Sequence, residues 1–425
     1  MDYPSRASLA NATGHLASFL SKVGGFGAGE TIGGAVALKV DPDLLSKVSM
    51  GRSIALVSAT NGKTTTNRFL ACALASKYPS VASNSGGANM ASGIAHALSL
   101  AKGVDVAALE VDESWLPMMI ENLKPKCVLM LNLTRDQLDR SNEVRKIAKK
   151  WKDAVSLNPE VTYIVNADDP LVSWSAIDAK RAIYVAGGQN WTLDSKSCPN
   201  CGELIENSAD GWACSGCNLK RMKPDFELSG VDGSILVSRE GEKWHIETKL
   251  PGSFNRSNAA FGAVAASVMG VPLAEALRAI KNVKSVGGRY ETVEFNHNNF
   301  PLRLLLAKNP AGWLEALSVV NKNNVVVLAI NAREVDGRDP SWLWDVDFGV
   351  LKGAFAVVTG ERARDLGVRL SYLEIDHVTI HKATDALRIA QAQAAKLNLD
   401  KNRPIDVIAN YTAFQGLRKI VKKMR

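Results

Sequence analysis

The stretch Ser58-Ala59-Thr60-Asn61-Gly62-Lys63-Thr64-Thr65 decides how this chain folds, and the apolar run 54–57 comes directly before it. Residues 67–74 follow with the spacing of a helix. A strand, a tight glycine-containing turn and a helix start, in this order, aim backbone N–H groups at a phosphate. In such a turn Lys63 reaches the terminal phosphates and the Thr64 hydroxyl ligates Mg²⁺. The stretch therefore predicts a nucleotide-binding P-loop.

The P-loop interpretation has one alternative. The full pattern has a glycine five residues before Gly62, where this chain has Val57. The alternative is an ordinary strand–helix turn that carries a surface lysine, and the wider sequence has to decide between the two.

The composition is that of an ordinary globular protein. The chain has 425 residues, of which 46% are hydrophobic and 22% charged, and a formal net charge of +8. This length suits two or three domains, and no apolar run approaches the roughly 20 residues that cross a bilayer. Segment 9–26 lacks the basic start and clean apolar centre of a signal peptide. We therefore expect a short amphipathic helix that packs on the body of a cytoplasmic protein.

Short apolar strands alternate with helical segments between residues 51 and 185, which indicates a parallel sheet covered on both faces. Active sites in such sheets lie at the carboxyl ends of the strands. Glu110 stands at such an end, where it would hold Mg²⁺ opposite Thr64; an ion pair with a nearby basic residue is the alternative. The strand candidates are 54–58, 106–110, 127–131 and 163–165.

Four of the six cysteines form two CxxC pairs, Cys198 with Cys201 and Cys214 with Cys217. Two such pairs can bring four thiolates to the corners of a tetrahedron, which predicts a structural Zn²⁺ site. A redox dithiol and an iron–sulfur cluster are the alternatives, and a disulfide pair is disfavoured in a cytosolic protein. The other two, Cys72 and Cys127, stand in apolar surroundings and are predicted to be buried thiols.

The alternating pattern restarts near residue 292, with strand candidates 302–306, 325–330, 354–358 and 405–408. We expect three regions: an N-terminal helical segment 1–50 that packs on the central domain, a central ATP-binding domain 51–288 with a zinc insertion at 190–225, and a C-terminal α/β domain 289–425. Arg289 and Lys308 would offer positive charge to a phosphate or carboxylate, with surface ion pairs as the alternative. The acidic stretch 336–348 also carries two tryptophans, which suits contact with a substrate or partner.

Together these motifs resemble the Mur ligase family, the ATP-dependent enzymes that build the peptidoglycan stem peptide. The short P-loop of that family lacks the early glycine and matches residues 60–65, while Ala59 stands where glycine is usual. Within the family the chain resembles the ligase-like subunit of lipid II isoglutaminyl synthase. The further marks are, in chain order, Asn89-Met90-Ala91, the Arg-Asp-Gln-Leu-Asp-Arg motif 135–140, the four-cysteine insertion, Phe254-Asn255 with Asn258, Lys308-Asn309-Pro310-Ala311-Gly312, 336–339 and Asn410-Tyr411-Thr412.

The resemblance implies a fold and a reaction. The fold would be an α/β Mur-ligase-type central P-loop domain with a parallel-rich sheet, an inserted four-cysteine zinc ribbon and a C-terminal Rossmann-like ligase domain. The enzyme would use ATP and Mg²⁺ to activate the α-carboxylate of D-glutamate in the lipid II stem peptide as an acyl phosphate. Ammonia from a GatD-like glutamine amidotransferase subunit, in a heterodimer, would then give D-isoglutamine. Such a complex works in the cytoplasm at the inner face of the membrane, with at most peripheral membrane contact and no nucleic acid.

The resemblance also implies roles for single residues. Lys63, Glu110 and Asp339 would be catalytic; Asp339 matches the acid that completes the Cys–His pair of the partner. Thr64 and Glu110 would hold Mg²⁺. Ala332-Arg333 stands where close relatives carry Asp-Asn. The nucleotide would be held by Thr60, Asn61, Gly62, Lys63, Thr64, Thr65, Asn258 and Arg289.

Two rival functions share part of this pattern. An amino-acid-adding Mur or folylpolyglutamate-type ligase would keep the P-loop, but the early position of the P-loop and the zinc insertion disfavour it. A zinc-ribbon nucleic-acid-binding protein would need a basic face around the cysteines. Acidic residues offset the basic ones there, namely Glu203, Glu206, Asp210 and Asp225.

Overall fold

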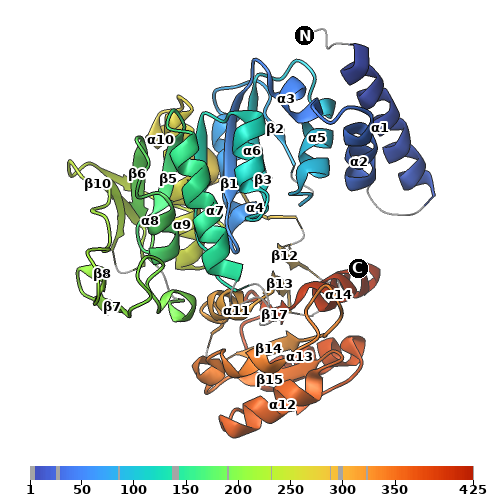
Figure 1. Ribbon diagram of the computed structural model, residues 1–425. Helices are drawn as coiled ribbons and strands as arrows, with labels where there is room; N and C mark the ends of the chain where they lie inside the picture. Colours follow the sequence, from blue (N-terminus) through green and yellow to red (C-terminus); the bar gives the residue numbers. More distant parts are fainter. Residues whose placement is uncertain are drawn as a thin grey trace. The chain divides into compact units, whose positions relative to one another are not determined.

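The computed structural model describes residues 5–24, 29–84, 87–135, 143–188, 191–230, 232–287, 289–294, 300–321 and 324–424. Most of the Arg-Asp-Gln-Leu-Asp-Arg motif therefore lies outside the described residues. The chain divides into two compact units. The first comprises Met1–Thr134 and Asn142–Lys284, and the second comprises Arg135–Ser141 and Ser285–Arg425. Each unit contains one large sheet covered by helices (Figure 1).

The sheet of the first unit has nine strands in the order β11-β10-β9-β6-β5-β4-β1-β3-β2. The strands from β2 to β9 in this order are parallel, and β10 and β11 close the sheet with antiparallel pairs. A separate two-stranded sheet, β7 with β8, lies in the four-cysteine insertion. The strand bounds are β1 Ser53–Ser58, β2 Ala82–Ser83, β3 Val106–Val111, β4 Cys127–Met130, β5 Thr162–Asn166, β6 Ala182–Ala186, β7 Ile205–Ser208, β8 Gly211–Cys214, β9 Phe226–Ser229, β10 Ile235–Ser238 and β11 Lys243–His245.

Helices cover both faces of this sheet, with α6 and α7 on the face nearer the viewer and α9 and α10 behind (Figure 1). The central strands β3 and β4 are buried along their whole length, as continuous apolar strands require. The helix bounds are α1 Ser5–Val23, α2 Glu30–Val40, α3 Leu44–Ser49, α4 Lys63–Leu74, α5 Ala91–Leu100, α6 Leu116–Leu123, α7 Glu143–Leu157, α8 Pro170–Ser175, α9 Ser253–Val268 and α10 Leu273–Ile280, with a short 3₁₀ turn η2 at Leu193–Ser195.

The second unit is built on a six-stranded sheet in the order β12-β13-β17-β14-β15-β16. All neighbouring strands are parallel except β12, which pairs antiparallel with β13. Two apolar clusters pack on its two faces. The bounds are β12 Tyr290–Val293, β13 Leu302–Leu306, α11 Pro310–Leu317, β14 Val325–Ala329, η3 Ser341–Trp344, η4 Phe348–Leu351, β15 Phe355–Thr359, α12 Ala363–Tyr372, β16 His377–Thr379, α13 Ala383–Lys396, β17 Ile405–Ala409 and α14 Tyr411–Met424.

The α/β class with parallel-rich sheets is confirmed, and all eight strand candidates correspond to strands, with ends that differ by at most two residues. Local caps explain where two helices begin. Asp169 accepts hydrogen bonds from the backbone of Leu171 and Val172 at the start of α8, and Asn309 accepts one from Gly312 at the start of α11. In both helices proline takes the next position, where its missing N–H costs nothing. Among the described residues, no helix is long and apolar enough to cross a membrane.

Candidate functional site

The P-loop lies between β1 and α4, at the carboxyl edge of the first sheet. Gly62 caps α4 with a φ of 82°, in the left-handed region that favours glycine. A Cβ at this position would lie 2.7 Å from Asn258 Oδ1, so Asn258 on α9 packs directly against the turn. Ala59, by contrast, is not among the residues with positive φ and is fully buried, so its methyl group fits the turn without strain.

The end of β4 holds the P-loop from the side. Asn132 accepts hydrogen bonds from Thr60 N through its backbone oxygen, at 3.0 Å, and from Asn61 N through its side chain, at 2.9 Å. Asn132 Nδ2 returns a 2.9 Å bond to Asn61 O. Thr60 and Asn61 also bond to Thr134 through their side chains. This clamp fixes the backbone of the loop before any phosphate binds.

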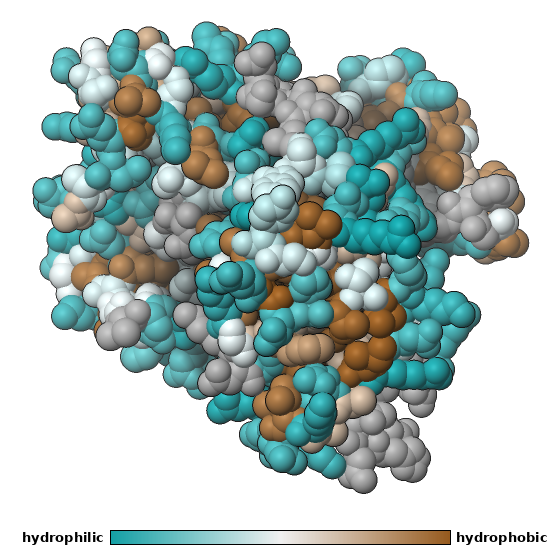
Figure 2. Space-filling view, turned by 90° about the horizontal axis from the view of Figure 1, so that it is seen from below, coloured by the Kyte–Doolittle hydropathy of each residue, from teal (hydrophilic) through white to brown (hydrophobic). Residues whose placement is uncertain are grey.

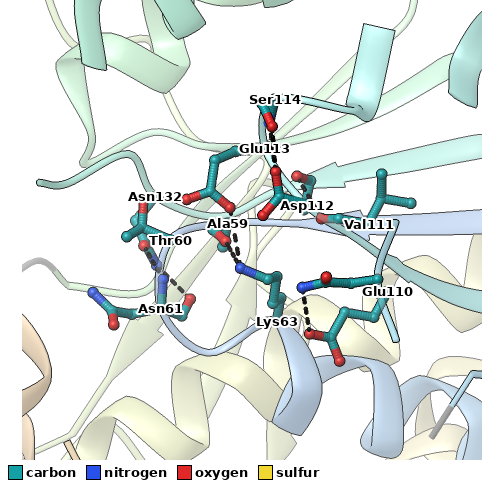
Figure 3. Close-up of polar contacts among 12 residues, drawn as sticks. Ala59, Thr60, Asn61, Lys63, Glu110, Val111, Asp112, Glu113, Ser114 and Asn132 are labelled. Carbon is teal, nitrogen blue, oxygen red and sulfur yellow. Dashed lines mark hydrogen bonds and ion pairs between the residues drawn. The ribbon is translucent and has the colours of Figure 1, made fainter. Parts of the chain in front are cut away.

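The Lys63 side chain is buried and points back across the loop (Figure 3). Its Nζ donates to Ala59 O at 2.7 Å and to Glu113 Oε2 at 3.0 Å. Burial alone would lower the pKa of Lys63, but the charges of Glu113, Glu110 and Asp112 raise that pKa above its ordinary value. Lys63 therefore stays a cation, and Glu113 is its counter-ion. Sequence reasoning did not assign this role to Glu113, because nothing in its spacing shows the contact.

Two buried oxygens beside Lys63 have no hydrogen-bond partner in the described part of the chain. They are Thr64 Oγ1, in the first turn of α4, and Glu110 Oε2, near the end of β3. The other carboxylate oxygen, Oε1, accepts a weak 3.4 Å bond from Asn89. A hydroxyl and a carboxylate left unsatisfied are a donor set that suits Mg²⁺. Thr64 and Glu110 thus fit the ion that the P-loop implies. The charge of Glu110 also acts on Lys63, but among the described residues Lys63 makes its salt bridge with Glu113.

The other predicted nucleotide residues fall in different places. Thr65 lies in the first turn of α4 with Thr64. Asn258 accepts a 3.1 Å hydrogen bond from the fully buried Thr66 and so supports the loop from beneath. Arg289 belongs to the second unit, where its backbone bonds to Val286 and Leu306.

Asp339 is exposed on the loop that joins β14 to η3 in the second unit. Its Oδ1 accepts a hydrogen bond from Ser341 N at 2.8 Å, and this bond lowers the pKa of Asp339, which is therefore ionised at neutral pH. Asp336 anchors the start of the loop by accepting bonds from the backbone and hydroxyl of Thr412. Arg333 makes an exposed ion pair with Glu361 at 2.8 Å.

The two tryptophans of the 336–348 stretch, which we expect to contact a substrate or partner, differ in their exposure to solvent. Trp342 is buried and packs against Trp313, with 5.8 Å between ring centroids. Trp344 is 53% exposed; the Arg369 guanidinium lies over its ring, and Tyr372 meets it edge to face. The 3₁₀ turn η3 points its successive side chains in different directions, which the run of sequence letters does not reveal.

The four cysteines of the insertion come together as predicted. Their sulfurs all lie within 4.8 Å of one another, with 3.4 Å between Cys201 and Cys214 and 3.8 Å between Cys198 and Cys217. Four thiolates about 2.3 Å from a zinc ion would stand roughly 3.8 Å apart, so the cluster fits a tetrahedral metal. Disulfide bonds would need sulfurs about 2 Å apart.

Polar contacts tie the cysteine module to the carboxyl end of β5, which sequence reasoning missed. The indole of Trp212 donates to Ala167 O at 2.9 Å, and Arg221 bonds to Asp168 at 2.8 Å. On the other side, Arg145 of α7 donates to Cys198 O at 3.0 Å. A metal held here would therefore stabilise the segment that follows β5 as well as its own loops.

Comparison with known proteins agrees with this architecture. The family model of the Mur ligase middle domain matches residues 57–266, and that of the MurT ligase C-terminal domain matches residues 306–414. The lipid II isoglutaminyl synthase (glutamine-hydrolyzing) subunit MurT of Staphylococcus aureus is 30% identical over 372 residues, which cover 82% of this chain and 84% of the relative. The subunit of the same name in Streptococcus pneumoniae is 27% identical over 424 residues, or 93% of each chain. Among solved structures, a pseudomurein peptide ligase type C from Methanothermus fervidus matches with a TM-score of 0.68 at 18% identity, covering 90% of this chain and 81% of that one.

A parallel sheet that carries a P-loop, followed by a second unit with a parallel-rich sheet, is the fold of ligases that couple ATP to bond formation. The chain belongs to the Mur ligase family, and within that family to the MurT branch.

Proposed function

We propose that this chain is the synthetase subunit of a lipid II isoglutaminyl synthase. It would use ATP to activate the α-carboxylate of D-glutamate in the stem peptide of lipid II, and ammonia would turn the acyl phosphate into the amide of D-isoglutamine. The observation that carries the proposal is the buried group of Lys63, Thr64 and Glu110, in a chain similar to MurT subunits along most of its length. Since ATP is the co-substrate, we place the reaction in the cytoplasm.

The residues of the P-loop supply binding and charge neutralisation. A carboxylate oxygen of the substrate attacks the γ-phosphorus, the bond to the β-phosphate oxygen breaks, and ADP leaves. Lys63 exchanges Glu113 for phosphate oxygens and neutralises charge as the phosphoryl group moves. Mg²⁺ held by Thr64 and Glu110 would supply further charge neutralisation. Ammonia then attacks the acyl carbon, and phosphate departs as the leaving group.

The nitrogen donor activity would come from a partner chain. Glutamine hydrolysis of the amidotransferase type needs an activated cysteine with a lowered pKa. The two cysteines outside the metal cluster have the opposite property, because burial raises the pKa of Cys72 and raises that of Cys127 to about 12. We propose a glutaminase subunit as that partner, with Asp339, exposed and ionised, orienting its catalytic histidine.

Lys63→Ala tests the P-loop role. We expect the variant to lose ATP-dependent amidation of lipid II while its circular dichroism remains that of a folded protein. Lys77→Ala is the matched control, because Lys77 lies just beyond the far end of α4, where its ammonium donates to Gly270 O and lies over the Tyr78 ring. Near-normal turnover by Lys63→Ala would refute the proposed chemistry.

Asp339→Asn tests the partner role. We expect a large loss of amidation driven by glutamine and a small loss with free ammonia. Asp347→Asn is the matched control, since both carboxylates are exposed and each accepts a 2.8 Å bond from the backbone N–H two residues later. Equal losses from both nitrogen sources would place Asp339 in the ligase site instead.

A further inference from the structure

Helix α1 presents large apolar side chains to solvent on one side. Five of them form what we call the apolar stripe: Leu9, Leu16, Phe19, Leu20 and Val23, with exposed fractions of 59%, 59%, 61%, 58% and 72%. At about 100° per residue, these positions fall within roughly 100° of the helix circumference. Figure 2 shows hydrophobic atoms gathered at the right-hand edge of the molecule, where α1 and α2 lie.

The opposite side of α1 buries small residues instead. Ala7, Ala10, Gly14 and Ser18 face the body of the protein. A Cβ on Gly14 would lie 2.7 Å from Gly33 O of α2. The arrangement is the reverse of the one expected in water, where an amphipathic helix buries its large apolar residues.

Close backbone contact through small residues, with large apolar side chains facing outward, is how helices pack when lipid surrounds them. Gly33 shows the same close approach in return, since a Cβ there would lie 2.7 Å from Gly14 O. On the far side of α2, a Cβ on Gly34 would lie 1.8 Å from Ser92 O of α5. The α1–α2 pair is thus held rigidly to the first unit while the apolar stripe stays uncovered.

The charge of α1 indicates what covers the stripe. Residues 5–23 contain no aspartate or glutamate, and they carry Arg6 and Lys22. An exposed apolar face on a helix whose own charged residues are both basic complements an anionic lipid surface. Because no described helix is long and apolar enough to cross a bilayer, the complementary geometry is a helix that lies in the plane of the membrane surface.

We propose that α1 docks the first unit on the anionic surface of a lipid bilayer, with the apolar stripe inserted at the boundary between headgroups and acyl chains. The benefit of docking for the reaction rests on the proposed function. A lipid-linked peptide stays in the membrane, so a ligase docked on that surface would search for it along the surface only. The docking itself depends only on α1 and needs neither ATP nor a working P-loop.

Flotation of the full-length protein with vesicles tests the proposal. We expect the wild type to float with vesicles of phosphatidylglycerol and phosphatidylcholine in equal parts, and to bind pure phosphatidylcholine vesicles much less. Leu16→Gln/Leu20→Gln should lower the partition coefficient at least about tenfold. The control is Leu157→Gln/Leu397→Gln, which changes two exposed leucines outside α1 (80% and 47% exposed) and should bind as the wild type does.

Unchanged vesicle binding by Leu16→Gln/Leu20→Gln would overturn the proposal, and so would equal binding of the wild type to both vesicle types. Analytical ultracentrifugation tests whether a second copy of the chain covers the apolar stripe instead. A wild-type dimer that Leu16→Gln/Leu20→Gln dissociates would also overturn the proposal. Vesicle binding by the Lys63→Ala variant separates the two proposals, because that variant should lose amidation and keep flotation.

Discussion

Replacing Gly62 with alanine adds one methyl group at the point where the P-loop turns into α4. Two costs follow from the structure. The φ of 82° puts an alanine in the left-handed region, at about 1–2 kcal/mol. The new Cβ would also stand 2.7 Å from Asn258 Oδ1, so that side chain must move.

Movement of Asn258 also removes a hydrogen bond from a second residue, Thr66. Asn258 Oδ1 is the acceptor for the hydroxyl of Thr66, which is fully buried, and an unsatisfied buried hydroxyl costs about 1–3 kcal/mol. Alanine also restricts the unfolded chain more than glycine does, and this offsets roughly 0.4–1 kcal/mol of the loss in the free energy of unfolding. The expected net loss in the free energy of unfolding is about 2–4 kcal/mol, together with weaker ATP binding.

Gly103→Ala is the control that separates the cost of a positive φ from the cost of the clash with Asn258. Gly103 has a φ of 73° and open space around its Cβ position, and it lies in the loop before β3, at the opposite edge of the sheet from the P-loop. Its expected loss is only about 0.5–1 kcal/mol. Urea denaturation gives the free energies of unfolding, and calorimetry gives the ATP affinity. If Gly62→Ala lost no more stability than Gly103→Ala and bound ATP normally, the role given to Asn258 would be wrong. Asn258→Ala should in turn cost less in the Gly62→Ala background than alone.

Three further predictions concern the metal, a buried ion pair and pH. Freshly purified protein should contain one zinc per chain by metal analysis, and Cys217→Ser should lose that metal and become protease-sensitive within 190–225; a metal-free wild type would contradict this. Arg303→Met should lower the free energy of unfolding by about 3–5 kcal/mol, because it leaves the buried Asp406 without the ion pair that now satisfies it, and Arg303→Met/Asp406→Asn should recover part of the loss in urea denaturation. Burial raises the pKa of Asp169 from 3.8 to about 6, so the folded state binds the proton more tightly than the unfolded state and the stability from this group falls as pH rises from about 4 to 6. Asp169→Asn should flatten that part of the stability profile, and parallel curves for the two proteins would contradict the assignment.

Sequence alone predicted the elements whose signal is local. The runs that became β1, β3, β4 and β14 are continuously apolar because both faces of a parallel strand are covered, so their composition marks them directly. The cysteine cluster could equally be predicted from sequence, since the CxxC spacing itself sets the geometry of a knuckle turn.

Sequence could not show contacts that depend on how distant segments meet. Glu113 pairs with Lys63 across 50 positions of sequence, and Asn132 reaches the P-loop from the end of another strand. Strand β6 was missed because only its last three residues are buried, so it lacks the continuous apolar run of the central strands. The inward turn of Trp342 depends on the tertiary packing of a 3₁₀ turn, which overrides the exposed appearance of an acidic stretch.

The ion pair between Lys63 and Glu113 affects which anions the P-loop would bind. Glu113 is tethered to the same chain, so it competes with every incoming anion at a fixed effective concentration. A single inorganic phosphate gains little by displacing it, because one anion replaces another at Lys63. ATP gains more, since its further phosphate oxygens also meet the backbone N–H groups of the P-loop. Because of this competition, the Glu113 carboxylate would favour polyphosphates over single phosphate anions as ligands of Lys63.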